Sequence, residues 1–131
     1  MSVITPPPIK AREMLGGHDA QYDKGTGIGR IRYKPNEGLM NPVGTVLGGY
    51  LTAMLDDVAG LVTWYTCGKR PFATAQMSTF FLRSAALEDM LTGEAQVTSN
   101  GKRQAFIEAR VKRESDNKTI ASATLVQTFL D

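Results

Sequence analysis

Residues 47–65 read LGGYLTAMLDDVAGLVTWY, and they carry the clearest periodic signal in the chain. Apolar residues recur there at the i, i+3, i+4 and i+7 spacing that places side chains on one face of an α-helix. These residues are Leu51, Met54, Leu55, Val58, Leu61, Val62 and Tyr65. A helix with such a face has to bury it against another layer of structure. The spacing therefore predicts one long helix from about Leu47 to Tyr65.

Downstream of this helix the apolar spacing changes to about two residues, which is typical of strands. Four strands are predicted, over residues 72–82, 90–99, 103–113 and 119–130. The pairs Asn100-Gly101 and Asp116-Asn117 favour tight hairpin turns, so these strands should be antiparallel. A fifth strand is predicted over residues 27–33. One long helix packed on a five-stranded antiparallel sheet is an α+β architecture.

The segment before these strands reads as irregular structure. Thr5-Pro6-Pro7-Pro8 lacks three backbone donors, which predicts an extended N-terminal arm over residues 1–8. A short helix is expected over residues 9–15, ended by Gly16-Gly17, with His18 in a polar surface loop behind it. No repeat or linker divides the 131 residues, so residues 1–131 are expected to form a single domain.

The composition excludes several functions. One Cys and one His exclude an internal disulfide and any metal site built from several thiolates or imidazoles within one chain. The net charge of +2, without a long basic run, gives no indication of nucleic-acid binding. No segment approaches the ~18 consecutive apolar residues of a membrane-spanning helix. We therefore expect a cytoplasmic protein with no metal, nucleic-acid or membrane site.

The face of the predicted helix opposite its apolar residues is unusual. It carries Gly49, Ala53, Asp56 and Gly60, and the helix contains no Lys, Arg or Glu, which an ordinary solvent face would have. One interpretation is a helix buried on both sides. That interpretation does not explain Asp56, because an unpaired buried carboxylate is costly. Asp56 is therefore a candidate site residue, with Asp57 as the comparison beside it.

The start of the helix supplies a second candidate feature. Gly48 and Gly49 leave backbone N–H groups accessible, and a helix N-terminus can hold an oxyanion. The alternative is that these glycines only allow close packing. Gly48 and Asp56 are eight residues apart, or ~12 Å along a helix, whereas both would have to lie near ~3 Å from one reacting group. Two antiparallel copies of the helix satisfy both distances, which favours a symmetric dimer with two shared sites.

Three motifs together resemble a known family. They are Asn41-x-x-Gly44-x-x-x-Gly48-Gly49, then Leu55-Asp56, then a strand that carries Thr74 and ends Phe81-Leu82-Arg83-Ser84. This pattern is similar to the hotdog-fold acyl-CoA thioesterases of the phenylacetate-pathway and 4-hydroxybenzoyl-CoA thioesterase type, from about Asn36 to the C-terminus. The resemblance implies a curved antiparallel sheet wrapped around one long central helix. It also implies a homodimer, often paired into a homotetramer.

The same resemblance implies catalytic roles. Gly48 would donate its backbone N–H to the thioester carbonyl, and Asn41 would assist there. Asp56, from the partner chain, would act as general base or nucleophile, and Thr74 would orient the attacking water. The expected product pair is a free acid and coenzyme A. No cofactor is expected, because coenzyme A is part of the substrate.

Further residues are predicted to contact the substrate. Leu47 stands where the family commonly has His or Gln, and Gly49 follows in the helix start. Arg83 is expected to meet coenzyme A phosphates, although a solvated role is the ordinary one for a surface Arg. The acyl or aryl group would meet aromatic residues, namely Phe72, Phe80 and Phe81. Core packing is the alternative role for most of these aromatic side chains.

A second class of function stays open at this point. A non-catalytic module that binds acyl-CoA or an acyl-carrier protein is favoured by Leu47, whereas Asp56 with Thr74 favours catalysis. A hotdog transcriptional sensor would need a helix-turn-helix, for which the chain has no spare residues. A dehydratase of this fold would need an Asp/His pair, and His18 lies in the wrong region.

Overall fold

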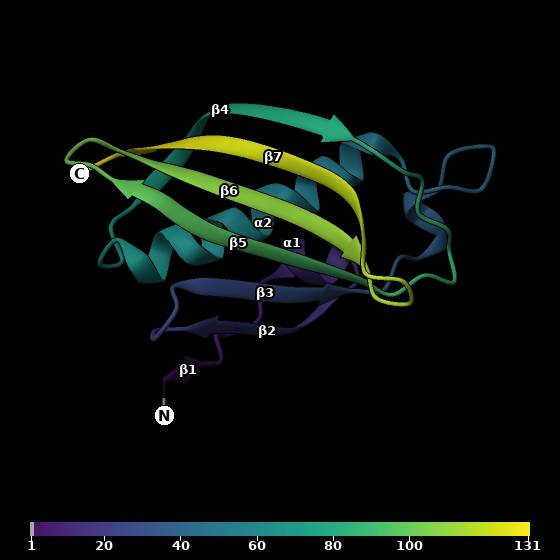
Figure 1. Cartoon of the computed structure of the whole chain (residues 1–131), viewed down its shortest axis with the longest axis horizontal. Helices are drawn as coiled ribbons and strands as arrows, with labels where there is room; N and C mark the ends of the chain where they lie inside the picture. The colour runs from purple at the N-terminus through teal and green to yellow at the C-terminus, as the bar shows by residue number, and fades with distance from the viewer. Residues whose placement is uncertain (1) are drawn as a thin grey trace.

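The computed structural model describes residues 2–131 and shows a curved antiparallel sheet packed against one long helix (Figure 1). The elements, in chain order, are β1 (Val3–Ile4), α1 (Lys10–Met14), β2 (Gly17–Asp23), β3 (Ile28–Tyr33), the 3₁₀ turn η1 (Glu37–Leu39), α2 (Gly48–Thr66), β4 (Phe72–Phe81), β5 (Leu91–Asn100), β6 (Gln104–Arg113) and β7 (Lys118–Phe129). The predicted α+β class is confirmed.

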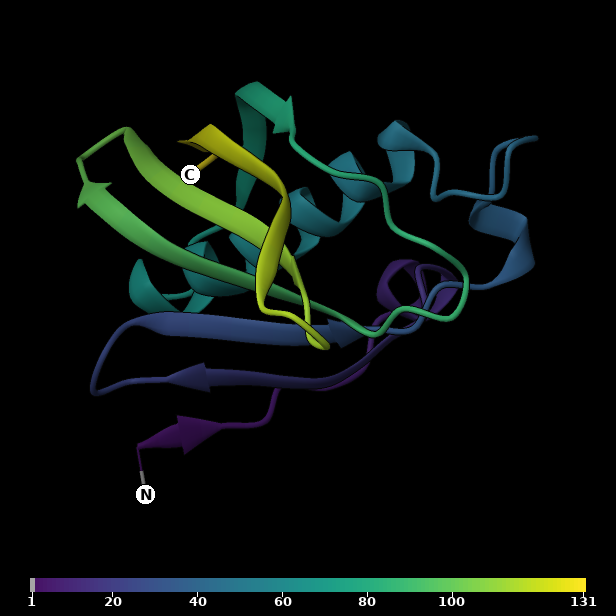
Figure 2. The same cartoon turned by 45° about the vertical axis from the view of Figure 1, so that its right-hand side comes forward.

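The seven strands form one sheet in the order β1-β2-β3-β5-β6-β7-β4, and every neighbouring pair is antiparallel. Strand β4 follows α2 in the chain but pairs with β7, so it forms one edge of the sheet, while the two-residue β1 forms the other. The turned view shows how the sheet curls around α2 (Figure 2). This curl leaves the long edge strand β4 beside the face of α2 that carries the candidate acid.

The predicted long helix is confirmed as α2. Its inward face consists of buried residues, namely Leu51, Met54, Leu55, Val58, Ala59, Leu61, Val62 and Thr63. The sheet approaches this face closely at glycine. A Cβ atom placed on Gly29 of β3 would lie 2.6 Å from Cγ1 of Val62, and one placed on Gly93 of β5 would lie 3.4 Å from Cγ1 of Val58. The absent side chains at these two positions thus set the distance between helix and sheet.

The expectation of five strands was wrong, because the N-terminal region adds two. His18 lies in β2, not in a loop, and residues 3–4 of the expected arm pair with β2 as β1. Strand β2 carries only two buried apolar residues, Ala20 and Tyr22, and its pairing is shifted between His18 and Gln21. Such a short and irregular alternation gives little periodic signal. The expected short helix is confirmed as α1.

Two kinds of feature are absent from the part of the chain that the structure describes. None of the helices in residues 2–131 is both long enough and apolar enough to cross a membrane. The same residues contain no group of three or more His, Cys, Asp or Glu side chains placed to hold a metal ion. The one cysteine, Cys67, is buried just after α2.

Candidate active site

Asp56 and Thr74 meet beside the edge of the sheet. Asp56 lies half-buried on the outward face of α2, and Thr74 is exposed near the start of β4. The Thr74 hydroxyl donates a hydrogen bond to Oδ1 of Asp56 at 2.7 Å. The pairing of β4 with β7 shifts between Thr74 and Gln76, and irregularities of this kind re-aim side chains at sheet edges. The structure therefore brings together the acid and the hydroxyl that the sequence predicted.

Gln127 lies behind Thr74, and the sequence analysis missed it. Its side chain is fully buried, and its amide Nε2 donates to the Thr74 hydroxyl oxygen at 3.2 Å. A sequence signal was present, because every second residue of β7 points into the core. The others in this series are apolar, namely Ala121, Ala123, Leu125 and Phe129. A glutamine in such a series is an anomaly that alternation alone could have flagged.

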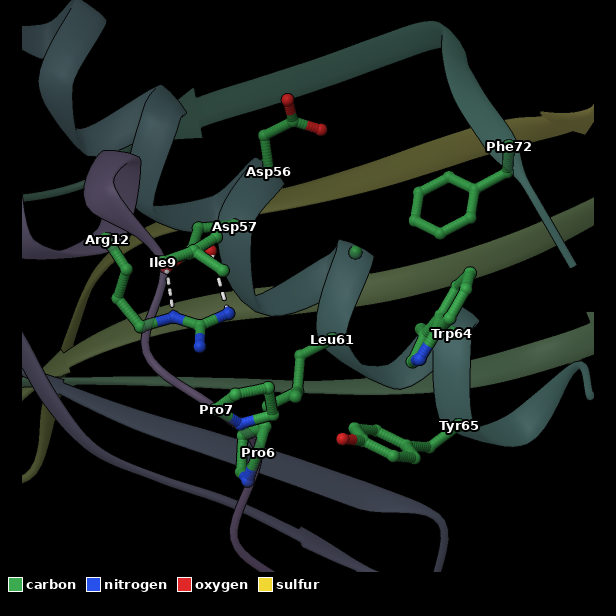
Figure 3. A pocket seen from close by; sticks show the side chains of 11 residues that line it. Pro6, Pro7, Ile9, Arg12, Asp56, Asp57, Leu61, Trp64, Tyr65 and Phe72 are labelled. Atoms are coloured by element: carbon green, nitrogen blue, oxygen red, sulfur yellow. Dashed lines mark hydrogen bonds and ion pairs between the residues drawn. The ribbon is translucent and has the colours of Figure 1, made fainter. Parts of the chain in front are cut away.

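An apolar pocket of about 440 Å³ opens next to Asp56 (Figure 3). Its apolar walls come from α2, from the start of β4 and from the N-terminal arm, and include Pro6, Pro7, Leu61, Trp64, Tyr65 and Phe72. Of the aromatic residues expected around an acyl group, Phe72 lines this pocket, whereas Phe80 and Phe81 do not. The contribution of the arm was not predicted. The lining also includes Arg12 and Asp57, so the pocket is mainly apolar and has the Arg12–Asp57 ion pair and the Asp56 carboxylate at its edge.

Asp57, the neighbour of Asp56, has very different surroundings. The Arg12 guanidinium donates to both carboxylate oxygens of Asp57, at 3.0 and 3.1 Å, and the Tyr33 hydroxyl donates to one of them at 2.7 Å. The side chains of Arg12 and Asp57 are each only 8% exposed. Figure 3 shows the Asp57 carboxylate turned toward Arg12 and that of Asp56 turned away from it. Asp57 therefore joins α1, α2 and β3, and its charge is already paired.

The surroundings of Tyr33 change the pKa of its hydroxyl. Burial raises the pKa of the Tyr33 hydroxyl well above its usual range, and the negative charge of Asp57 raises this pKa further. The Met54 carbonyl lies 3.2 Å from the same hydroxyl oxygen and shares its single proton with Asp57. Tyr33 is thus held neutral as a hydrogen-bond donor, which suits a structural role for Asp57.

The start of α2 offers free backbone donors. Leu47 occupies the position before the helix without a capping hydrogen bond from its side chain, and it is 46% exposed. The N–H groups of Gly48 and Gly49 have no acceptor within residues 2–131, as expected in a first helical turn. A Cβ atom on Gly49 would meet nothing within 4 Å, whereas one on Gly48 would contact the Phe81 ring at 3.4 Å. This end of the helix can accept an anion or a polarised carbonyl.

Phe81 and Arg83 border the same helix end. They line a hollow of about 320 Å³ together with Gly48. Arg83 donates one hydrogen bond from Nη1 to the Thr119 carbonyl at 2.7 Å. The guanidinium carries further N–H donors, which can bind a phosphate. The structure thus places two of the predicted substrate-binding side chains beside Gly48.

Asn41 is engaged in the loop before α2. Its Oδ1 accepts from the backbone N–H groups of Val43 and Thr45, at 3.1 and 3.0 Å. Its Nδ2 donates to the Thr45 hydroxyl at 2.8 Å. An amide nitrogen has two N–H donors, so one remains for a substrate carbonyl. The geometry explains how Asn41 shapes the loop, and its contact with substrate stays a prediction.

The predicted residues therefore fall into two separate places. One is the acid corner, Asp56 with Thr74 beside the apolar pocket, and the other is the helix-start corner around Gly48. The two cavities share no lining residue. Because eight helical residues span ~12 Å, one copy of α2 holds the two corners apart.

The sequence and the fold were both compared with those of known proteins. The sequence model of the thioesterase superfamily matches residues 43–120, which include both corners. The phenylacetic acid degradation-related protein of Ralstonia eutropha JMP134 has 30% identity and a TM-score of 0.83, covering 93% of this chain and 92% of its own. No curated protein matches the sequence significantly.

Two more distant structures share the fold. The PaaI protein of the E. coli phenylacetic acid degradation operon has 20% identity and a TM-score of 0.78, covering 92% of this chain and 83% of its own. A hypothetical thioesterase of Streptococcus pneumoniae, solved with coenzyme A, has 22% identity and a TM-score of 0.74, covering 79% and 78%. The expected hotdog fold is confirmed by these neighbours.

Proposed function

The chain belongs to the thioesterase superfamily, and from this premise we propose that it hydrolyses acyl-CoA thioesters at a site completed by a second copy of itself. Membership makes the chain a thioester hydrolase. The acyl-CoA substrate is the part we infer, supported by the family and by the coenzyme A bound to the S. pneumoniae neighbour.

The observation that carries this proposal is the Thr74–Asp56 hydrogen bond of 2.7 Å at the mouth of an apolar pocket. A carboxylate held by one hydroxyl can take a proton from water, and the pocket can hold the acyl or aryl group while excluding bulk solvent. A direct attack by the Asp56 carboxylate on the thioester is the alternative route. It would form a mixed anhydride that water then cleaves.

In the water route, Asp56 removes a proton from water as the water oxygen bonds to the thioester carbonyl carbon. The carbonyl oxygen becomes an oxyanion, which the Gly48 N–H stabilises with help from Asn41. The C–S bond then breaks and coenzyme A leaves as a thiolate. A thiol has a pKa of about 8.5, so this leaving group needs little acid assistance. No histidine is required by this chemistry.

The second copy supplies the helix start. Strand β4 is a ten-residue edge strand, and exposed edges of this length favour pairing with another chain. Beside it, Trp64 is 38% exposed at the rim of the pocket. Pairing through β4 would lay two copies of α2 antiparallel, so that Asp56 of each faces Gly48 of the other. The dimer then has two equivalent sites.

The test is release of thiol from short, medium, long and aryl acyl-CoAs by the wild type and by Asp56→Asn. The exchange keeps the shape of the side chain and should lower kcat at least ~10²-fold, the range for loss of a general base. Glu88→Gln, at an exposed position, is the matched control and should hydrolyse normally. Tight acyl-CoA binding without hydrolysis by the wild type would instead indicate a binding module.

A further inference from the structure

We propose that Gln127 is a positioning residue, which fixes the direction of the Thr74–Asp56 hydrogen bond. This inference rests on the proposed function, because it assigns Gln127 a role through the two residues of the acid corner. In the part of the chain that the structure describes, the Gln127 side chain makes no hydrogen bond to Asp56 and does not line the apolar pocket. Its only hydrogen-bond partner within residues 2–131 is the Thr74 hydroxyl.

Stability does not explain this glutamine. Gln127 has no exposed surface, and its Oε1 has no hydrogen-bond partner in the described chain. A buried polar atom without a partner destabilises the folded protein. The flanking inward positions of β7, Leu125 and Phe129, are apolar and buried. An apolar side chain of similar length would therefore suit this position better in the folded protein.

Proton counting explains what the amide does. The Thr74 hydroxyl has one proton and two lone pairs. Asp56, as a carboxylate, can only accept, so Thr74 must give its proton to Asp56 along the 2.7 Å contact. The atom of Gln127 that faces Thr74 at 3.2 Å must then be a donor, which the amide nitrogen is and the amide oxygen is not.

Because the Gln127 N–H points at the Thr74 oxygen, the Thr74 proton cannot turn toward Gln127 and stays directed at Asp56. The Gln127 N–H occupies one lone pair of the Thr74 oxygen, and the second lone pair remains for the attacking water. The water can therefore give one hydrogen to Thr74 and the other to Asp56. Gln127 keeps the hydroxyl, and through it the water, in the geometry that general base catalysis requires.

Two exchanges separate this role from packing. Gln127→Met keeps the length of the side chain and removes the donor, so kcat should fall about tenfold, as for one lost hydrogen bond. KM should stay within about twofold, because the substrate still binds, and Tm should stay equal or rise. Gln127→Glu would accept the Thr74 proton and add a second negative charge near Asp56. Its kcat/KM profile should shift to higher pH.

The decisive measurement is a double-mutant cycle of kcat for Gln127→Met and Thr74→Ala. If Gln127 acts through Thr74, Gln127→Met should have no further effect once Thr74 is replaced. Additive losses, or a lower Tm with unchanged kcat, would overturn the proposal and leave Gln127 a packing residue. Wild-type hydrolysis by both Thr74→Ala and Asp56→Asn would instead contradict the proposed site itself.

Discussion

Asp56 and Asp57 are adjacent on α2, yet the structure predicts that replacing each by Asn has opposite consequences. Asp57 is held by Arg12 through two hydrogen bonds and by Tyr33 through a third. Asp56 is half-buried and accepts one hydrogen bond, from Thr74. Asp57→Asn should therefore lower stability and spare catalysis, whereas Asp56→Asn should lower catalysis and spare stability.

The magnitude for Asp57 follows from its burial. Breaking a buried ion pair costs ~3–5 kcal/mol, because the remaining charge has no counter-charge. With both side chains 8% exposed, and with Asn still able to accept one of the hydrogen bonds, we expect the lower end, about 3 kcal/mol. In a chain of 131 residues each kcal/mol corresponds to roughly 3–4 °C, so Tm should fall by about 10 °C.

The assay combines thermal unfolding with thiol release measured well below Tm. Asp57→Asn should show the lower Tm with kcat per folded molecule near wild type, and Arg12→Met, which removes the other half of the pair, should reproduce that Tm. Asp56→Asn should keep Tm within about 2 °C and lose most of kcat. An Asp57→Asn protein with normal Tm and no hydrolysis would refute the assignment of the two carboxylates.

Three further results are expected. Burial and the Asp57 charge raise the pKa of Tyr33 in the folded protein, so its contribution to stability is complete below about pH 10 and falls above it, by up to ~1.4 kcal/mol per pH unit. Tyr33→Phe should remove that part of the alkaline fall of Tm, and an unchanged slope would contradict this. Gly29→Ala places a Cβ atom 2.6 Å from Val62 and should lower the urea midpoint by the equivalent of about 1–3 kcal/mol, whereas Gly49→Ala, in open space, should not. Burial raises the pKa of the Cys67 thiol, so native protein should react with a thiol reagent at least about tenfold more slowly than protein in urea, and equal rates would contradict the buried placement.

The parts of the fold that sequence predicted are those with long, regular periodicity. The helix over residues 47–65 and the strands after it have periodic patterns of apolar residues that last ten residues or more. Their positions could therefore be predicted to within a residue or two. Strands β1 and β2 were missed, because two residues and an irregular seven give no comparable pattern. Strand β2 is positioned by pairing with β3, and β1 by pairing with β2, and both pairings are tertiary contacts.

The candidate site, too, could be predicted from the sequence only in part. The helical wheel placed Asp56 on the outward face, and the structure puts it beside Thr74 as expected. The structural role of Asp57 could not be predicted from the sequence, because its partners Arg12 and Tyr33 lie 45 and 24 residues away in the chain. Only the folded chain brings such residues together.

The central claim, a site shared between two copies, can be tested by mixing two inactive variants. Asp56→Asn damages the acid corner, and Gly48→Pro removes the backbone N–H of the helix start. Proline is tolerated at a first helical position, and Leu47 has ψ 136°, which suits a residue before proline. Gly48→Ala keeps the N–H and serves as the matched control.

After the two variants are unfolded together and refolded, half of the dimers should contain one chain of each kind. Each mixed dimer pairs the intact Asp56 of one chain with the intact Gly48 of the other, at one of its two sites. The account therefore predicts that thiol release recovers to ~25% of the wild-type rate. A mixture that stays at the sum of its two separate variants would contradict the shared site and place the whole reaction within one chain.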